Sequence, residues 1–179
     1  AGYQLRKLFC GSEGTLGVVT QAILKLSPDP KQQFTALLAV RDAPGLVKLA
    51  TKLRAESGEF LSAMEFFSDV GLGIALENIP GLVFPLQSRA SFYLLVEAGS
   101  GSMQVPLDSI LTEVMEWGMS GGIVVDGALA QSKAQRAAFW RLREEQPEGQ
   151  RRLGAQLKHD ISVPPGQIKT TSTSDESIK

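Results

Sequence analysis

The sequence predicts an α+β fold in which two split βαβ units share one sheet. Segments of strand length, rich in β-branched and other apolar residues, alternate along the chain with amphipathic segments of helix length. The chain has 179 residues, which suits one domain or one domain with a piece of another, and 43% of them are hydrophobic. We expect the helices to pack mainly on one face of the sheet. The alternation alone leaves open whether neighbouring strands run parallel or antiparallel.

The first strand and helix lie within residues 34–58. Residues 34–40 are mostly apolar and of strand length. Asp42 then offers a side-chain cap, Pro44 suits the first helical turn, and Gly58 suits the end of the helix. The apolar face of this helix repeats at intervals of three and four residues, at Leu46, Leu49, Ala50 and Leu53.

A second strand, a short helix and a third strand follow. Residues 61–67 predict the second strand, and Ser68 caps a helix that reaches about Asn78. Residues 79–88 form a loop with several Pro and Gly residues, and residues 91–97 predict the third strand.

The remaining elements continue the alternation. Residues 106–118 predict the clearest amphipathic helix of the chain, and residues 123–130 predict a strand. Ser132 caps a long helix that we expect to run through about Arg152, and residues 156–163 predict a last strand. The apolar face of the 106–118 helix comprises Leu107, Ile110, Leu111, Val114 and Met115.

A glycine-rich segment near the N-terminus is the first candidate binding element. Residues 11–17 are GSEGTLG, and residues 18–26 after them predict a strand. Such a loop lets a ligand approach the backbone and offers N–H groups to a phosphate. It lacks the Walker Gly-Lys-Ser/Thr ending and is followed by a strand, so the Rossmann pattern does not fit. Its spacing alone favours a plain turn between strands.

Composition narrows the classes of function. The 18 basic and 19 acidic residues leave a net charge of −1, which does not favour a nucleic-acid binder. The single cysteine, Cys10, excludes an internal disulfide framework and favours a reducing compartment, and we expect a cytoplasmic protein. A lone histidine, His159, excludes a histidine-cluster metal site within the chain. No apolar run is long enough for a transmembrane segment, and no signal peptide is evident.

The second candidate element is the long helix and the strand after it. Helical spacing places Arg136 and Arg143 on one face, two turns apart, with Trp140 beside them. Arg143 can clamp a carboxylate with two parallel hydrogen bonds, and Lys158 can add a second cation. On residue types alone, a solvated helix face with a lysine at the sheet rim is the stronger interpretation. His159 points to the other side of that strand and is more often a packed residue than a base.

Three motifs in this order resemble one family of flavoproteins. LFCGSEGTLGVVT, at residues 8–20, resembles the end of the FAD-binding domain of the vanillyl-alcohol oxidase/p-cresol methylhydroxylase flavoproteins. FWRLREE at 139–145 and KHDISVP at 158–164 are similar to the C-terminal, or cap, domain of their D-lactate, D-2-hydroxyglutarate and glycolate dehydrogenase branch. The resemblance covers about residues 2–168. It implies a ferredoxin-like arrangement with an antiparallel sheet.

The resemblance also implies the roles of individual residues. Arg143 matches the arginine that holds the substrate carboxylate, and Lys158 matches a second substrate-binding cation. Pro147 stands where some members have a threonine, which disfavours a dicarboxylate such as 2-hydroxyglutarate and favours a D-lactate- or glycolate-like substrate. The positions that match FAD contacts are Ser12, Glu13, Gly14, Thr15, Gly17 and Val18.

The expected domain organisation follows from the same resemblance. Residues 1–30 match the end of an FAD-binding domain, and residues 31–168 match a cap domain that is incomplete at its C-terminal end. Residues 169–179 are a polar tail, either disordered or foreign to the protein. Since the chain has no initiating methionine, we expect a fragment. No catalytic residue or metal ligand is predicted in it, because the family's base and metal-binding histidines lie further along.

The resemblance implies an FAD-dependent oxidoreductase that oxidises a D-2-hydroxy acid by hydride transfer to the flavin. The parent protein would need an electron acceptor and could hold a divalent metal, and it is either cytoplasmic or peripheral at a membrane. We expect the fragment itself to be inactive and to form homodimers through exposed apolar surface. The alternative is a stand-alone ferredoxin-like module that binds a carboxylate or mediates association. An FAD domain upstream in the same reading frame would distinguish the two.

Overall fold

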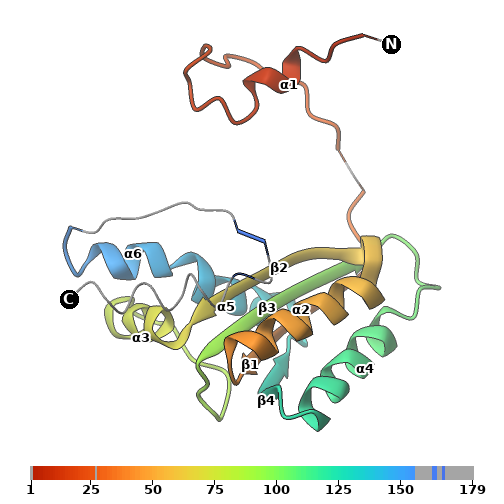
Figure 1. Ribbon diagram of the computed structural model, residues 1–179, viewed down its shortest axis with the longest axis vertical. Helices are drawn as coiled ribbons and strands as arrows, with labels where there is room; N and C mark the ends of the chain where they lie inside the picture. Colours follow the sequence, from red (N-terminus) through yellow and green to blue (C-terminus); the bar gives the residue numbers. More distant parts are fainter. Residues whose placement is uncertain (1, 27, 156–162, 165–166, 168–179) are drawn as a thin grey trace.

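The computed structural model describes residues 2–26, 28–155, 163–164 and 167. Its main body is one sheet with helices packed against it, and the N-terminal segment lies apart from that body (Figure 1). Within the part described, no helix is both long and apolar enough to cross a membrane.

The sheet has four strands in the order β2-β3-β1-β4, and every neighbouring pair is antiparallel. Each pair of strands joined through a crossover, β1 with β2 and β3 with β4, is separated by a strand of the other pair. This is the arrangement of two split βαβ units, and it confirms the predicted α+β class and antiparallel sheet. The strands are β1 (Gln32–Val40), β2 (Leu61–Ser68), β3 (Phe92–Ser100) and β4 (Val124–Leu129).

The two longest helices lie on one face of the sheet. Helix α2 (Ala43–Ser57) and helix α4 (Leu107–Ser120) run side by side across it (Figure 1). Their apolar residues pack against alternate strand residues such as Leu38 and Leu94. Their spacing in the sequence therefore translates directly into the first core of the domain.

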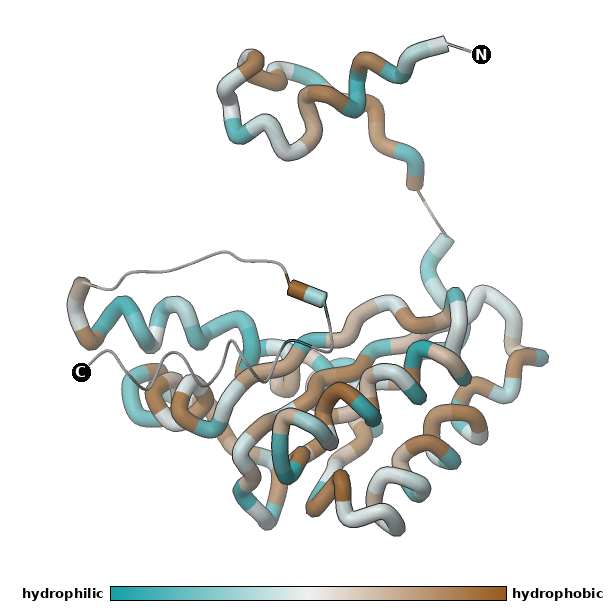
Figure 2. Tube along the Cα trace, viewed as in Figure 1, coloured by the Kyte–Doolittle hydropathy of each residue, from teal (hydrophilic) through white to brown (hydrophobic). Residues whose placement is uncertain are grey.

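The opposite face is covered as well. Helix α3 (Asp69–Asn78), inserted between β2 and β3, and helix α5 (Lys133–Glu144), after β4, contribute to a second core there. Leu37 belongs to this core and Leu38 to the first, and both are fully buried. A strand covered on both faces shows a continuous apolar run rather than alternation, which explains the composition of β1 (Figure 2).

Three of the predicted helix starts are confirmed by side-chain caps. Asp42 Oδ1 accepts a hydrogen bond from the backbone N–H of Gly45 at 2.7 Å. Ser68 and Ser132 cap α3 and α5 in the same way, at 3.1 and 3.2 Å. Each cap accepts one of the backbone N–H groups that have no partner within the first turn, so the helix begins at that residue.

The prediction of one long helix from Ser132 to about Arg152 is wrong, because the structure has two helices there. Helix α5 ends at Glu144, and helix α6 (Gln146–Arg151) begins beyond Glu145. Pro147 lies just after this break, in the first turn of α6. Proline has no N–H to donate to the carbonyl four residues back, and its ring crowds that carbonyl, so one continuous helix cannot pass through it.

The strand predicted over residues 18–26 is not formed. These residues have no regular secondary structure, and the segment before them holds only the short helix α1 (Arg6–Phe9). A strand requires a neighbour for its backbone groups, and within the described ranges no strand pairs with this segment. The last predicted strand, 156–163, lies outside the described residues except for Val163, and the tail 169–179 lies wholly outside them.

Candidate functional site

Helix α5 presents three polar side chains to the sheet from one helical face. They are four and three residues apart, the spacing that aligns side chains along a helix. Each forms a hydrogen bond with a different strand. The pairs are Arg136 Nη1 with Gln33 Oε1 of β1, Trp140 Nε1 with Glu97 Oε2 of β3 at 2.9 Å, and Arg143 Nε with Glu65 Oε2 of β2 at 3.0 Å. We call these six side chains the polar row.

The polar row crosses the sheet face under α5, from Gln33 near one end of β1 to Glu65, which lies opposite Leu95 in the β2–β3 register. Beside and beyond it, the same face carries buried apolar residues such as Leu37, Phe67 and Leu95. Thr35 lies opposite Glu97 in the antiparallel register, and its hydroxyl donates to Glu97 Oε2 at 3.2 Å. The sheet face thus changes from apolar core to hydrogen-bonding groups within a few residues, which is where a polar ligand can be recognised.

Arg143, the predicted carboxylate-binding residue, is held at only one of its nitrogens. Its Nε donates to Glu65, while the described residues provide no hydrogen bond to its two terminal nitrogens. The side chains of Arg143 and Glu65 are 37% and 42% exposed, so the guanidinium is accessible from solvent. Two parallel N–H donors on a fixed guanidinium match the two oxygens of a carboxylate. The geometry therefore suits the predicted role, which stays a prediction.

Arg136 is the second cation of the row. Its side chain is partly buried, and its Nε is buried without a hydrogen-bond partner in the described part of the chain. It bonds the neutral amide of Gln33 and forms no ion pair with the carboxylates described. The row thus holds two guanidinium groups, Arg136 and Arg143, and two carboxylates, Glu65 and Glu97, whose charges cancel. Recognition of an anion there depends on the directed N–H donors of the guanidinium groups and not on net charge.

The other substrate-site prediction is not placed by the structure. Lys158 and His159 lie outside the described residues, so no distance from Lys158 to Arg143 is available. Pro147 lies in the first turn of α6, four residues after Arg143 in the sequence. The effect of this proline on the choice of substrate stays a prediction.

The glycine-rich loop forms a tight, exposed turn. Glu13 and Gly14 have φ values of +51° and +81°, and the Thr15 backbone N–H and hydroxyl both donate to the Ser12 carbonyl, at 2.9 and 2.6 Å. A Cβ atom placed on Gly14 would meet nothing within 4 Å, so this side of the loop is open. Gly17 and Val18 continue the exposed chain. An exposed turn of this kind can fit closely against a cofactor such as FAD.

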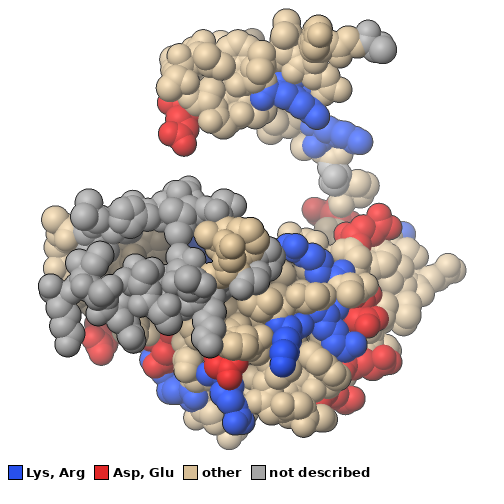
Figure 3. Space-filling model, viewed as in Figure 1, with Lys and Arg blue, Asp and Glu red and all other residues tan. Residues whose placement is uncertain are grey.

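Two features of the described residues bear on other kinds of site. No group of three or more His, Cys, Asp or Glu side chains among them is placed to hold a metal ion. Acidic and basic side chains are interspersed over the visible face of the body, without a patch of one sign (Figure 3).

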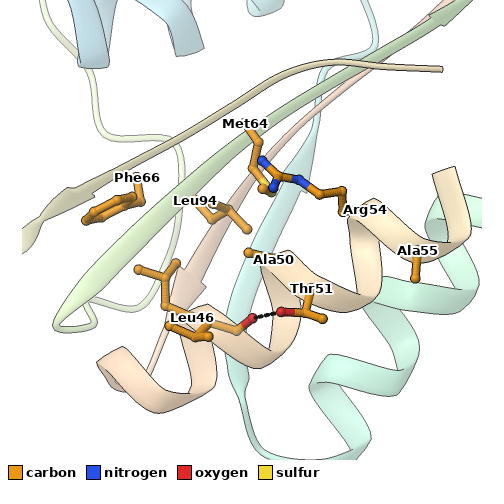
Figure 4. A pocket seen from close by; sticks show the side chains of 9 residues that line it. Leu46, Ala50, Thr51, Arg54, Ala55, Met64, Phe66 and Leu94 are labelled. Carbon is orange, nitrogen blue, oxygen red and sulfur yellow. Dashed lines mark hydrogen bonds between the residues drawn. The ribbon is translucent and has the colours of Figure 1, made fainter. Parts of the chain in front are cut away.

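A concave pocket of about 510 Å³ lies on the opposite face of the sheet, between α2 and β2. Its lining is mostly apolar, with Arg54 reaching over it, and the Thr51 hydroxyl donates to the backbone carbonyl of Val47 at 2.8 Å instead of to the pocket (Figure 4). The pocket and the polar row are on different sides of the sheet, so the pocket does not belong to the predicted carboxylate site. Its lining residues are Leu46, Val47, Ala50, Thr51, Arg54, Ala55, Met64, Phe66 and Leu94.

Comparison with known families gives the deciding observation. The family described as "FAD linked oxidases, C-terminal domain" matches residues 29–172, most of the chain. The chain belongs to this family. The membership predicted from the three motifs is thereby confirmed.

Curated relatives support the same conclusion. A mitochondrial D-2-hydroxyglutarate dehydrogenase of Arabidopsis thaliana is 34% identical over 167 residues, which are 93% of this chain and 30% of the relative. A probable mitochondrial D-2-hydroxyglutarate dehydrogenase of Oryza sativa is 38% identical, over 91% of this chain and 29% of the relative. A D-2-hydroxyglutarate–pyruvate transhydrogenase of Saccharomyces cerevisiae is 32% identical, over 90% and 32% respectively. The chain thus spans about a third of the length of these relatives.

Sequence reasoning did not identify the strand partners of α5. Glu65 and Glu97 are charged residues within strands that are otherwise largely apolar, and that contrast is the one signal they carry. Each is remote in sequence from its partner on α5, by 78 residues for Glu65 and 43 for Glu97. Only the packing of α5 across the sheet brings them together.

Proposed function

We propose that this chain is part of an FAD-dependent oxidoreductase that oxidises a D-2-hydroxy acid to the 2-oxo acid. The observation that carries the proposal is the accessible Arg143 guanidinium, which is fixed at Nε and has both terminal nitrogens directed to no described residue. A 2-hydroxy acid has a carboxylate next to the reacting carbon, so a clamp on that group orients the carbon. Family membership supplies the reaction class.

The chain's own residues bind and orient the substrate in this proposal. Arg143 donates hydrogen bonds from its terminal nitrogens to the substrate carboxylate, and Lys158 adds a second positive charge. Bound FAD would supply the two-electron acceptor for the hydride that leaves the hydroxyl-bearing carbon. A base takes the hydroxyl proton, and we assign that role to no residue of this chain. The residues that would hold one edge of the flavin are Ser12, Glu13, Gly14, Thr15, Gly17 and Val18.

The domain assignment belongs to the same proposal. Residues 1–30 complete an FAD-binding domain, and residues 31–168 form a cap domain over the substrate. We infer that the chain alone neither retains FAD nor turns over. Mixing it with FAD and dialysing should leave no stoichiometric flavin absorbance, and a flavin spectrum that persists would overturn this part of the proposal.

The identity of the hydroxy acid has two candidates. Pro147, in place of a threonine, favours a small monocarboxylate such as D-lactate or glycolate. The names of the relatives favour D-2-hydroxyglutarate, and one of these names also includes pyruvate. Steady-state kinetics of the full-length protein with each acid and an artificial electron acceptor would separate them through the ratio of kcat/KM values.

A matched pair of variants tests the role of Arg143 within the full-length protein. Arg143→Ala should raise KM for the preferred acid by about 100-fold or more, because a charge-assisted bidentate contact is lost. Arg141→Ala is the control, since Arg141 pairs with Glu145 at 3.6 Å and does not belong to the polar row. Equal kinetics for the two variants would refute the proposed carboxylate site.

The cellular setting stays a prediction. The single cysteine favours a reducing compartment such as the cytoplasm, whereas the names of several relatives include the word mitochondrial. Homodimerisation is also untested, and size-exclusion chromatography of the chain would decide it.

A further inference from the structure

We propose that Glu65 is a positioning residue for substrate binding: it fixes the guanidinium of Arg143 so that its two terminal nitrogens face the substrate carboxylate. This inference rests on the function proposed above. It concerns a residue on β2 that neither the family comparison nor the sequence motifs assign.

Glu65 contacts Arg143 at Nε and not at the end of the guanidinium. A guanidinium can pair with a carboxylate at its end, through both terminal nitrogens, or along its side, through Nε and one terminal nitrogen. Glu65 Oε2 accepts from Nε at 3.0 Å, which uses the side of the group. The end of the guanidinium keeps two parallel N–H donors, the arrangement that a substrate carboxylate requires.

The contact with Glu65 also restricts the motion of the Arg143 side chain. An unrestrained arginine side chain samples many rotamers and loses conformational entropy when it is fixed. Here, Arg143 is anchored at its backbone in α5 and at its Nε by a group on β2. Glu65 itself lies opposite Leu95 in the β2–β3 register, so its backbone position is set by the sheet. Part of the ordering therefore precedes substrate binding.

The hydrogen bond from Arg143 to Glu65 and the negative charge of Glu65 have opposite effects on substrate binding. Glu65 carries a negative charge beside the cation that is proposed to attract the substrate. That charge weakens the attraction of Arg143 for an anion, whereas the hydrogen bond orients the fork. A neutral acceptor of the same size should preserve the orientation, and an apolar side chain of the same length should not.

The experiment compares Glu65→Gln with Glu65→Met in the full-length protein. Glutamine keeps an acceptor oxygen for Nε and should keep kcat/KM within about 3-fold. Methionine matches the length without a carboxylate or amide acceptor and should lower kcat/KM about 10- to 100-fold, as expected for a misplaced binding group. Glu56→Gln serves as a control with unchanged kinetics, because Glu56 pairs with Lys52 on α2.

A double-mutant comparison distinguishes positioning from a purely structural role. In an Arg143→Ala background, Glu65→Met should cause no further loss of kcat/KM, because Glu65 acts only through Arg143. If Glu65→Met instead lowers the melting temperature with kinetics equal to Glu65→Gln, the ion pair only ties α5 to β2 and the inference is wrong. A wild-type protein without activity on any 2-hydroxy acid would refute the proposed function instead.

Discussion

The indole Nε1 of Trp140 donates a hydrogen bond of 2.9 Å to Oε2 of Glu97, and Thr35 donates to the same oxygen at 3.2 Å. This carboxylate lies on β3, a central strand, and thus connects α5 to the middle of the sheet. It is also the central contact of the polar row. The orientation of α5, and with it the position of Arg143, depends in part on Trp140.

Trp140→Phe should lower the free energy of unfolding by about 1–2 kcal/mol, because the Glu97 carboxylate loses one of its two described hydrogen-bond donors and the smaller phenyl ring gives up part of the packing of the indole. Urea denaturation followed by circular dichroism measures this change. Trp117→Phe is the control. Trp117 is 39% exposed and lies under the Lys52 ammonium at 5.4 Å, so its loss should have a smaller effect.

The elements of the sheet and its helices were predictable because their signals are local. Caps such as Asp42 and Ser68, and apolar spacing along α2 and α4, each involve residues within a few turns of one another. The break before Pro147 also had a local signal, which the strong helical pattern around it outweighed.

Contacts between distant elements were not predictable in the same way. The partner of Arg143 on β2 is determined by the strand order and by how α5 crosses the sheet, neither of which is encoded in residue spacing. Residues 18–26 illustrate the converse case, since they have a strand-like composition but no strand beside them in the described part. Strand propensity is realised only with a partner.

Tyr93→Phe should destabilise the domain by about 1–2 kcal/mol at pH 8. Tyr93 is fully buried, and its hydroxyl donates to Asp69 Oδ1 at 2.7 Å and accepts from the Ala90 N–H at 3.1 Å. The substitution leaves the Ala90 N–H without its acceptor, whereas Asp69 keeps its ion pair with Arg89 at 2.7 Å. Chemical denaturation measures the loss, and Tyr3→Phe, at a 97% exposed position, should have no effect.

The same residue gives a dependence on pH. Burial, and next the hydrogen bond to Asp69, raise the pKa of Tyr93 to about 12 from its ordinary value of 10. The folded state therefore retains the phenolic proton at pH values where the unfolded chain releases it. The contribution of the Tyr93 hydroxyl to the free energy of unfolding is complete below pH 10 and is lost as the pH rises from 10 to 12. The stability difference between wild type and Tyr93→Phe should narrow over that interval. A stability difference between wild type and Tyr93→Phe that stays constant from pH 8 to 12 would contradict this prediction.

Deletion of residues 1–28 should leave the stability of the sheet domain unchanged. None of the described side chains among them is buried, and Val18 and Ile23 are 88% and 103% exposed. Removal of surface groups without buried contacts changes the free energy of unfolding by no more than about 0.5 kcal/mol. Urea midpoints of the full and shortened chains provide the measurement. A markedly lower midpoint would show that this segment packs on the domain.

Gly149→Ala should destabilise the domain by about 1–3 kcal/mol, because α6 crosses α3 at this glycine without room for a side chain. An added Cβ would lie 2.9 Å from Ala75 Cα and 3.3 Å from Ala75 N, and the backbone atoms of the fully buried Ala75 cannot move aside cheaply. Gly73→Ala in α3 is the matched control. Its Cβ would meet only Arg89 Nη2, at an ordinary 3.6 Å, so the better helix propensity of alanine should leave stability equal or raise it by up to about 1 kcal/mol. Thermal denaturation of both variants measures the contrast, and equal melting temperatures would mean that α6 can shift away from α3.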